Sequence, residues 1–300
     1  VMSEFVSIYR GGVNAWECDI MGHFNVQFYA AKLSEGMGHL GRALGLTPAH
    51  GIGLRQRRNF NRYLGELHAG DLVDIRAAVL AVDADSVDLL AEVVNGTTGQ
   101  VSATFEVRCV GHDPAMDQAR PWPQDVRQHM TAMIAPPAGP SRPATAGGPV
   151  PVQSGALVEP FISSRGMVAA WHCDPDGQMS AQHYYRIGFD GIGYVRHRTG
   201  VTNAVAQANK WGGAALEYAL DLLAPIGAGD QFTLRSGLLD LGGKTFRFGH
   251  CLYNDSSGTL AATYDVIGCM LDLQARRAMT IPGEIRARSQ KLIIPWPPGG

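Results

Sequence analysis

The feature that most constrains this chain is an internal repeat, because a duplicated sequence folds as two similar units. Sliding the sequence by 155 positions places residues 11–47 on residues 166–202 with 13 identities in 37 positions, where chance gives about two. Further along, the offset becomes 159, so that Ala69 to Asp71 matches Ala228 to Asp230. The shared residues include Trp, Cys, Asp and Gly at fixed positions, which indicates a tandem duplication rather than a coincidence of apolar patterns.

The repeat also predicts the domain boundaries. We expect an N-terminal domain at 1–118, a linker at 119–160, a C-terminal domain at 161–290 and a tail at 291–300. Proline removes a backbone donor and glycine raises the entropy cost of order, so the runs at 135–140 and 146–151 are typical of a linker. A short helix is predicted within it, from Gln124 to Ile134.

Each copy predicts one long helix followed by strands. From Val26 to Leu44 apolar residues recur in steps of three and four, with Asn25 placed to cap the start and Gly45 the end. Two costly helix glycines, Gly36 and Gly38, recur in the second copy and indicate that the helix lies close against another backbone surface. Alternating patterns predict strands at 72–82, 86–94 and 100–110, and at 231–241, 245–253 and 259–270. The predicted fold class is α+β, with a curved antiparallel sheet wrapped around a long central helix in each copy.

Composition excludes several classes of function. A formal net charge of -2 gives no field for nucleic acid or an anionic membrane. The five cysteines show no CxxC spacing, and their odd number argues against a disulfide framework, so we expect a reducing cytoplasm. The N-terminal residues lack a leader pattern, and no apolar run approaches the length of about 18 residues that spans a membrane. Ten scattered histidines without an HExxH pattern, and the lack of a glycine-rich phosphate loop, predict neither a metal site nor a bound cofactor.

One motif opens the helix of the first copy. Residues 16–29 read Trp-Glu-Cys-Asp-Ile-Met-Gly-His-Phe-Asn-Val-Gln-Phe-Tyr, and the second copy carries Cys-Asp-Pro-Asp-Gly at 173–177. The first segment resembles the hotdog superfamily, in its 4-hydroxybenzoyl-CoA thioesterase-like branch: Asp, two variable residues, Gly, His, an apolar residue, Asn, then Tyr. The second resembles the Cys-Asp-Pro-x-Gly form of the 4-hydroxybenzoyl-CoA enzymes. The likeness covers about 110 residues in each half.

The resemblance implies hydrolysis of an acyl thioester. The substrate would be a small-molecule acyl-CoA or an acyl-carrier protein, with coenzyme A entering only as part of the substrate. The pantetheine arm would lie in a groove between two paired hotdogs, here an intramolecular pseudo-dimer that could associate further.

The chemistry needs a group that attacks the carbonyl or activates water, together with donors where negative charge develops. Asp19 is the candidate nucleophile or general base, and the helix N-terminal amides near Asn25 and Val26 are the candidate oxyanion hole. Gly22 permits the tight turn, while His23 and Asn25 would orient the water or carboxylate, or bind the acyl group. The alternative is that Asp19 is only a turn residue or helix cap and His23 is structural.

The second copy keeps Asp174 and Gly177, but Gln178, Met179 and Ser180 stand where His23, Phe24 and Asn25 stand in the first. We therefore expect Asp19 to be the principal carboxylate, with Asp174 a second active residue or a relic. The helix acids Glu35 and Asp190 also correspond, and a solvated or capping role is predicted for them.

Further candidates bind substrate. Arginine forks suit phosphate oxygens, so the basic stretch after the helix would hold the nucleotide end of coenzyme A, the alternative being a solvated charged loop. Its arginines are Arg55, Arg57, Arg58 and Arg62. Tyr29 either lines the acyl pocket or packs in the core, and we favour core packing for Tyr29, Tyr184, Trp16 and Trp171. Cys18 and Cys173 are interpreted as small buried residues, not nucleophiles.

Two other functions remain open at this stage. A catalytically silent acyl-CoA-binding hotdog module would share the fold without a working carboxylate. A hotdog hydratase or dehydratase would use an Asp-His pair in a different motif, of the type Tyr-x-x-x-Asp-x-Asn-x-x-His, which we do not find in the sequence.

Overall fold

The computed structural model describes residues 5–114, 116, 118–134 and 155–296. The chain forms two compact units, Val1–Arg142 and Pro143–Gly300, and each is described by itself. The predicted linker runs at 135–140 and 146–151 lie outside the described residues.

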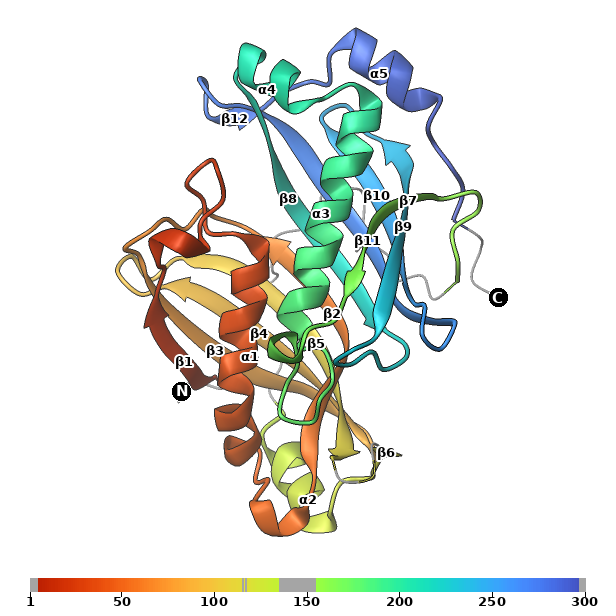
Figure 1. Cartoon of the computed structure of the whole chain (residues 1–300). Helices are drawn as coiled ribbons and strands as arrows, with labels where there is room; N and C mark the ends of the chain where they lie inside the picture. The colour runs from red at the N-terminus through yellow and green to blue at the C-terminus, as the bar shows by residue number, and fades with distance from the viewer. Residues whose placement is uncertain (1–4, 115, 117, 135–154, 297–300) are drawn as a thin grey trace. The chain divides into compact units, whose positions relative to one another are not determined.

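The first unit is an antiparallel sheet with a long helix (Figure 1, red to yellow). Its strands run in the order β1-β3-β4-β5-β2, and the short β6 pairs with β5. The strands are β1 (Val6–Gly12), β2 (Gly53–Tyr63), β3 (Leu72–Val82), β4 (Ser86–Asn95), β5 (Val101–Asp113) and β6 (Gln118–Ala119). Helix α1 (Val26–Ala43) packs on β1, β2 and β3, and α2 (Gln124–Ala132) packs on β3.

The second unit repeats this plan (Figure 1, green to blue). Its strands run in the order β7-β9-β10-β11-β8, and the short β12 pairs with β11. The strands are β7 (Phe161–Met167), β8 (Trp211–Leu222), β9 (Gln231–Leu241), β10 (Thr245–Asn254), β11 (Thr259–Asp272) and β12 (Arg277–Ala278). Helix α3 (Ala181–Thr199) packs on β7, β9 and β10, with α4 (Asn203–Asn209) against β8 and α5 (Gly283–Gln290) against α3.

The two units are built on the same backbone hydrogen bonds. The amide of Val13 donates to the carbonyl of Asp71, and in the second unit Val168 donates to Asp230, each at 2.9 Å. These pairs correspond under the offsets of 155 and 159 read from the sequence. The structure thus confirms the duplication and the predicted α+β fold.

The predicted strands are all present, and each copy also has further strands, of which β2 and β8 are the longest. Strands β3 and β9 have the predicted bounds. The ends of β4, β5, β10 and β11 differ from the predicted ends by at most three residues. The alternative of a charged loop at 55–62 is wrong, because this segment is β2 and pairs with β5 along its length. Charged side chains hid the strand pattern there, whereas the ladder itself is made by backbone groups.

Helix α1 begins and ends as predicted. The side chain of Asn25 accepts a hydrogen bond from the amide of Gln27 at 3.0 Å. Gly45, at φ +89°, takes the left-handed conformation just after the helix, and the amide of Leu46 donates back to Gly41. A glycine in this position ends a helix without the steric cost that a side chain would carry.

The helix glycines divide into two kinds. A Cβ on Gly36 would lie 3.2 Å from the carbonyl oxygen of Ile8, and one on Gly191 would lie 2.5 Å from Leu234 Cδ2. The predicted close approach is therefore confirmed at Gly36, where α1 meets the backbone of β1, whereas Gly191 meets side chains. For Gly38 and Gly193 the prediction is wrong, because no described atom would lie within 4 Å of their Cβ.

This contrast gives a matched pair of substitutions. Gly193→Ala should raise the free energy of unfolding by up to about 1 kcal/mol, since alanine is the better helix former and the site is open. Gly191→Ala should lower it by about 1 to 3 kcal/mol through overpacking. Urea unfolding followed by circular dichroism checks the signs, and equal stability of the two variants would contradict the packing described.

The core of the second unit holds a buried polar chain. His250 Nδ1 lies 2.6 Å from Ser236 Oγ, which lies 2.5 Å from Ser163 Oγ. His250 is fully buried, and its Nε2 has no hydrogen-bond partner among the described residues. Burial lowers the pKa of His250 to about 3, so the imidazole is neutral at pH 7.

The lowered pKa predicts a loss of stability in acid. Below the unfolded-state pKa of about 6.5, the unfolded chain binds a proton that the folded chain does not, so the free energy of unfolding falls by up to about 1.4 kcal/mol per pH unit until the folded pKa is reached. His250→Ala should lower stability at pH 7 and flatten this dependence, whereas His197→Ala, on the exposed face of α3, should not flatten it. Urea unfolding at pH 7, 6 and 5 measures the slopes; an unchanged slope in His250→Ala would refute the assignment.

Candidate active site

Asp19 lies in a tight turn just before α1. Its Oδ1 accepts hydrogen bonds from the amides of Met21 at 2.8 Å and His23 at 3.1 Å. The backbone closes the same turn, since the amide of Asp19 donates to the carbonyl of His23 and Gly22 donates to Asp19. Gly22 has φ +81°, which the turn requires and which L side chains rarely adopt. One carboxylate oxygen is thus held by the turn, and the carboxyl group is fixed in position.

Asp174 makes the same turn in the second unit. Its Oδ1 accepts from the amides of Asp176 at 3.0 Å and Gln178 at 3.1 Å, and Gly177 has φ +78°. This geometry fits both predicted roles, turn residue and catalytic carboxylate, because an aspartate that caps its own turn is also held in place for chemistry.

The first amides of α1 follow the Asp19 turn directly. Asn25 engages two of them: its side chain accepts from Gln27 and its carbonyl accepts from Phe28 at 2.8 Å. The amide of Val26 makes no hydrogen bond among the described residues. In the second unit Ser180 stands at the N-cap of α3, but its side chain does not accept a capping hydrogen bond, and its hydroxyl donates to the carbonyl of His172 at 3.2 Å.

A buried ion pair that the sequence did not suggest lies behind the first turn. Lys32 Nζ lies 2.7 Å from Glu17 Oε1, and both side chains are almost fully buried. Glu17 Oε2 also accepts from the amide and side chain of Asn14, and the carbonyl of Glu17 accepts from the amide of Asn25. Burial alone would lower the pKa of Lys32, but the hydrogen bonds that its ammonium donates to Glu17 and Tyr9 raise the pKa, so the lysine stays charged. The pair ties α1 to the segment that enters the turn.

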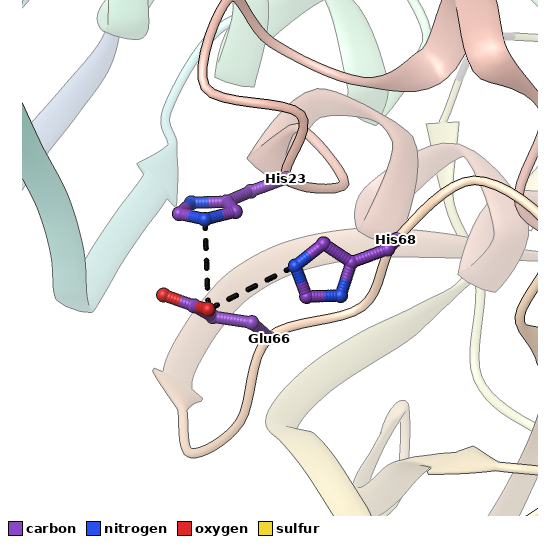
Figure 2. Close-up of side chains that lie close together, drawn as sticks. All are labelled: His23, Glu66 and His68. Carbon is purple, nitrogen blue, oxygen red and sulfur yellow. Dashed lines mark ion pairs between the residues drawn. The ribbon is translucent and has the colours of Figure 1, made fainter. Parts of the chain in front are cut away.

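His23 lies beside a glutamate and a second histidine (Figure 2). His23 Nε2 is 3.5 Å from Glu66 Oε2, and His68 Nε2 is 3.9 Å from the same oxygen. Glu66 and His68 belong to the segment between β2 and β3, where His23 and His68 form an isolated antiparallel bridge. Sequence reasoning missed both residues, since they are far from the motif in the chain. A comparison of the two copies could have identified them, because Pro225 and Gly227 occupy the corresponding positions of the second copy and the acid and the histidine are therefore specific to the first.

The cysteine beside each aspartate is a poor nucleophile. Burial raises the pKa of the Cys18 thiol, and the negative charge of Asp19 adds to this effect. The pKa of Cys173 is raised by burial and by Asp174 in the same way. We predicted that both cysteines would be buried, but both are half-buried. All five cysteines of the chain are free thiols. Attack by a thiolate is disfavoured because the thiol form is stabilised.

The aromatic residues around the turns are placed differently from one another. Tyr29 and Tyr184 are buried, as predicted. The prediction of core packing is wrong for the tryptophans, since Trp16 is 71% exposed and Trp171 is 82% exposed. Both tryptophans stand on single 3-10 turns, Ala15–Glu17 and Ala170–His172. Trp16 contacts the ring of Phe28 edge to face.

The four candidate phosphate ligands Arg55, Arg57, Arg58 and Arg62 all lie on β2. A β-bulge between Gln56 and Arg58 interrupts the alternation, and the Arg62 guanidinium lies over the ring of Phe60 at 4.9 Å. On helix α1, Glu35 is exposed, and on α3 Asp190 lies 3.8 Å from Arg186 one turn earlier. Both helix acids are consistent with solvated positions.

Comparisons with known proteins agree with the duplicated fold. The sequence profile of the thioesterase-like superfamily matches residues 13–130 and again 168–289. A search of curated protein sequences gave no match. Within the described residues, no helix combines the length and apolar character needed to cross a bilayer.

Two solved structures resemble the chain over most of its length. An acyl-ACP thioesterase from Bacteroides thetaiotaomicron has a TM-score of 0.64 at 11% identity, with 89% of this chain and 100% of that chain covered. The 12:0-ACP thioesterase from Umbellularia californica has a TM-score of 0.64 at 9% identity, with 90% of this chain and 96% of that chain covered. At such identities the likeness shows the fold, while the family profile covers both repeats. The chain therefore belongs to the thioesterase-like superfamily, as two hotdog domains in tandem, and its enzyme class is thioester hydrolase.

Proposed function

We propose that this chain hydrolyses an acyl thioester of coenzyme A or acyl-carrier protein, with Asp19 as the nucleophile or general base. The observation that carries the proposal is the fixed carboxylate of Asp19, held by two amides at 2.8 and 3.1 Å just before the N-terminus of α1. Its place in a thioesterase-like chain supports the same reaction.

The chemistry follows from the two oxygens of Asp19. Oδ1 is engaged by the turn, so Oδ2 is the oxygen that attacks the carbonyl carbon or takes a proton from the attacking water. Negative charge then develops on the carbonyl oxygen, where the Val26 amide and the positive end of the α1 dipole would stabilise it. The carbon–sulfur bond breaks, and the thiolate takes a proton. If Asp19 acts as the base, this is the proton that it took from the attacking water; if Asp19 acts as the nucleophile, the proton comes from solvent, and water then hydrolyses the anhydride between Asp19 and the acyl group.

The first copy is the proposed working copy. It alone has a histidine and an asparagine at the positions of His23 and Asn25, and Asn25 caps the helix that supplies the amide. In the second copy Gln178 and Ser180 occupy these places, and the serine hydroxyl is directed to the carbonyl of His172 instead. The second copy thus keeps the backbone of the Asp174 turn but lacks the histidine and asparagine side chains beside it.

Two features favour a long-chain or pantetheine-linked acyl substrate. Trp16, just before the Asp19 turn, and Ile20, within it, are exposed apolar side chains of the kind that bind an acyl chain or a pantetheine arm. The similar structures are named as acyl-ACP and 12:0-ACP thioesterases. The arginines of β2 remain our candidates for the nucleotide phosphates when the carrier is coenzyme A.

The test is a matched pair of isosteric substitutions. Asparagine keeps the Oδ1 acceptor that closes the turn but cannot attack or take a proton, so Asp19→Asn separates chemistry from folding. We expect it to reduce thiol release from a panel of acyl-CoAs and acyl-carrier proteins at least about 100-fold, the effect typical of losing a positioned base. Asp174→Asn should retain most of the activity.

A reagent that reports free thiol measures the release. Loss of activity in Asp174→Asn, with Asp19→Asn as fast as the parent, would move the reaction to the second copy. Binding of an acyl-CoA without cleavage by the parent chain would identify an acyl-binding module and reject the proposal.

A further inference from the structure

The cluster of His23, Glu66 and His68 has the composition of a transition-metal site. Two imidazoles and one carboxylate form a common three-residue ligand set for Zn²⁺, which leaves a fourth position for water. One candidate ligand atom from each residue lies within 4.8 Å of the other two. Figure 2 shows the two rings directed toward the same carboxylate from two different segments of the first unit.

The backbone explains why these three side chains converge. His23 and His68 are opposite each other in an antiparallel bridge, which places their side chains on the same face. Glu66 is two residues before His68, and its carboxylate lies on the side of the bridge that the two histidines share, 3.5 Å from His23 Nε2. The amide of Phe24 donates to the carbonyl of Leu67 at 2.7 Å and holds the two segments in this register.

The distances are close to those that a bound ion requires. With metal–ligand bonds of about 2.1 Å, tetrahedral ligands are separated by about 3.4 Å. His23 Nε2 and Glu66 Oε2 are already 3.5 Å apart, and His68 Nε2 is 3.9 Å from the same oxygen. The remaining adjustment falls on Glu66 and His68, whose side chains are each 46% exposed and have room to rotate.

A second carboxylate lies behind His68. Asp71 Oδ2 accepts from the backbone amide of His68 at 2.8 Å and lies 4.0 Å from its Nδ1. A carboxylate on the far side of a histidine ring holds the proton on Nδ1 and leaves Nε2 to coordinate the metal. In this structure Asp71 holds the backbone of His68 through the amide hydrogen bond, and its distance of 4.0 Å to Nδ1 is longer than a hydrogen bond.

The second copy shows that the fold does not need these three residues. Gln178 and Gly227 form the same isolated bridge, Met179 donates to Ile226 at 2.8 Å, and Asp230 accepts from the amide of Gly227 at 2.9 Å. The scaffold is thus present without the donors, because Gln178, Pro225 and Gly227 replace His23, Glu66 and His68. The donor set is an addition of the first copy and not a requirement of the turn.

From these contacts we propose that His23, Glu66 and His68 form a binding site for one divalent transition-metal ion, Zn²⁺, with at least one coordination position open to solvent. The site shares His23 with the proposed thioesterase site, but zinc binding requires only the three donor residues and no substrate. Its test therefore uses metal binding alone.

The experiment measures zinc on the full chain. The chain is freed of any affinity tag, stripped with a chelator and titrated with Zn²⁺ against a chromophoric zinc indicator, and the bound metal is counted by mass spectrometry after dialysis. We expect one high-affinity ion per chain. His68→Ala and Glu66→Gln should each weaken binding at least about tenfold, because even residues that only orient metal ligands have effects of this size.

His50→Ala is the matched control. His50 Nε2 lies 3.5 Å from Asp125 Oδ2, the same pairing at the same distance as His23 and Glu66 but outside the cluster. This variant should bind zinc as the parent does. His23→Gln introduces the residue type that the second copy folds with, so it tests the third ligand with little risk to the fold.

A Co²⁺-substituted chain gives an independent readout. Visible absorption bands of a four- or five-coordinate cobalt site are expected in the parent and in His50→Ala, and should be lost in His68→Ala. Less than one zinc per chain in the parent, or equal zinc affinity in the parent, Glu66→Gln and His68→Ala, would overturn the proposal.

Discussion

The local geometry of the candidate site depends on a single carboxylate oxygen. Asp19 Oδ1 accepts two amides of its own turn and thereby stabilises the left-handed Gly22. The chain then reverses so that Phe24 pairs with Leu67 and Asn25 begins the helix. In the second unit Asp174 Oδ1 likewise accepts two amides of its own turn. Because the turn occupies one oxygen, the other has a defined position at the helix start, where a helix dipole favours negative charge.

The two copies preserve this scaffold and differ in the side chains around it. The first unit has a buried Glu17–Lys32 ion pair behind the turn, while His172 and Ile187 stand at these positions in the second. Breaking a buried ion pair by removing one partner is costly, so the pair keeps the entry to α1 in one arrangement. The second unit instead contains the buried chain of His250, Ser236 and Ser163 between β7, β9 and β10. The two copies therefore share one backbone framework but have different buried polar side chains.

Much of the fold could be predicted from the sequence because the repeat and the hydrophobic periodicity are local signals. The helix caps at Asn25 and Gly45 are of this kind, as are the bounds of β3 and β9. Strand β2 escaped prediction because its arginines mask the alternation, although its backbone pairs with β5 as any strand does. Trp16 was assigned to the core from its size, but a 3-10 turn exposes it.

The site was predictable only in its contiguous part. Asp19, Gly22 and Asn25 lie within one motif, and the resemblance placed them together. Glu66 and His68 reach His23 through an isolated bridge that joins segments far apart in the chain, and pairing of this kind is not visible in residue spacing. The Glu17–Lys32 pair was hidden for a related reason, since both residue types are usually on the surface.

The most direct measurement is a crystal structure of the chain with a non-hydrolysable thioester of coenzyme A. The account predicts that the thioester carbonyl carbon lies within about 3.5 Å of the Asp19 carboxylate, or one water away from it. The carbonyl oxygen should lie about 3 Å from the Val26 amide. A thioester bound with its carbonyl away from the Asp19 turn would contradict the account.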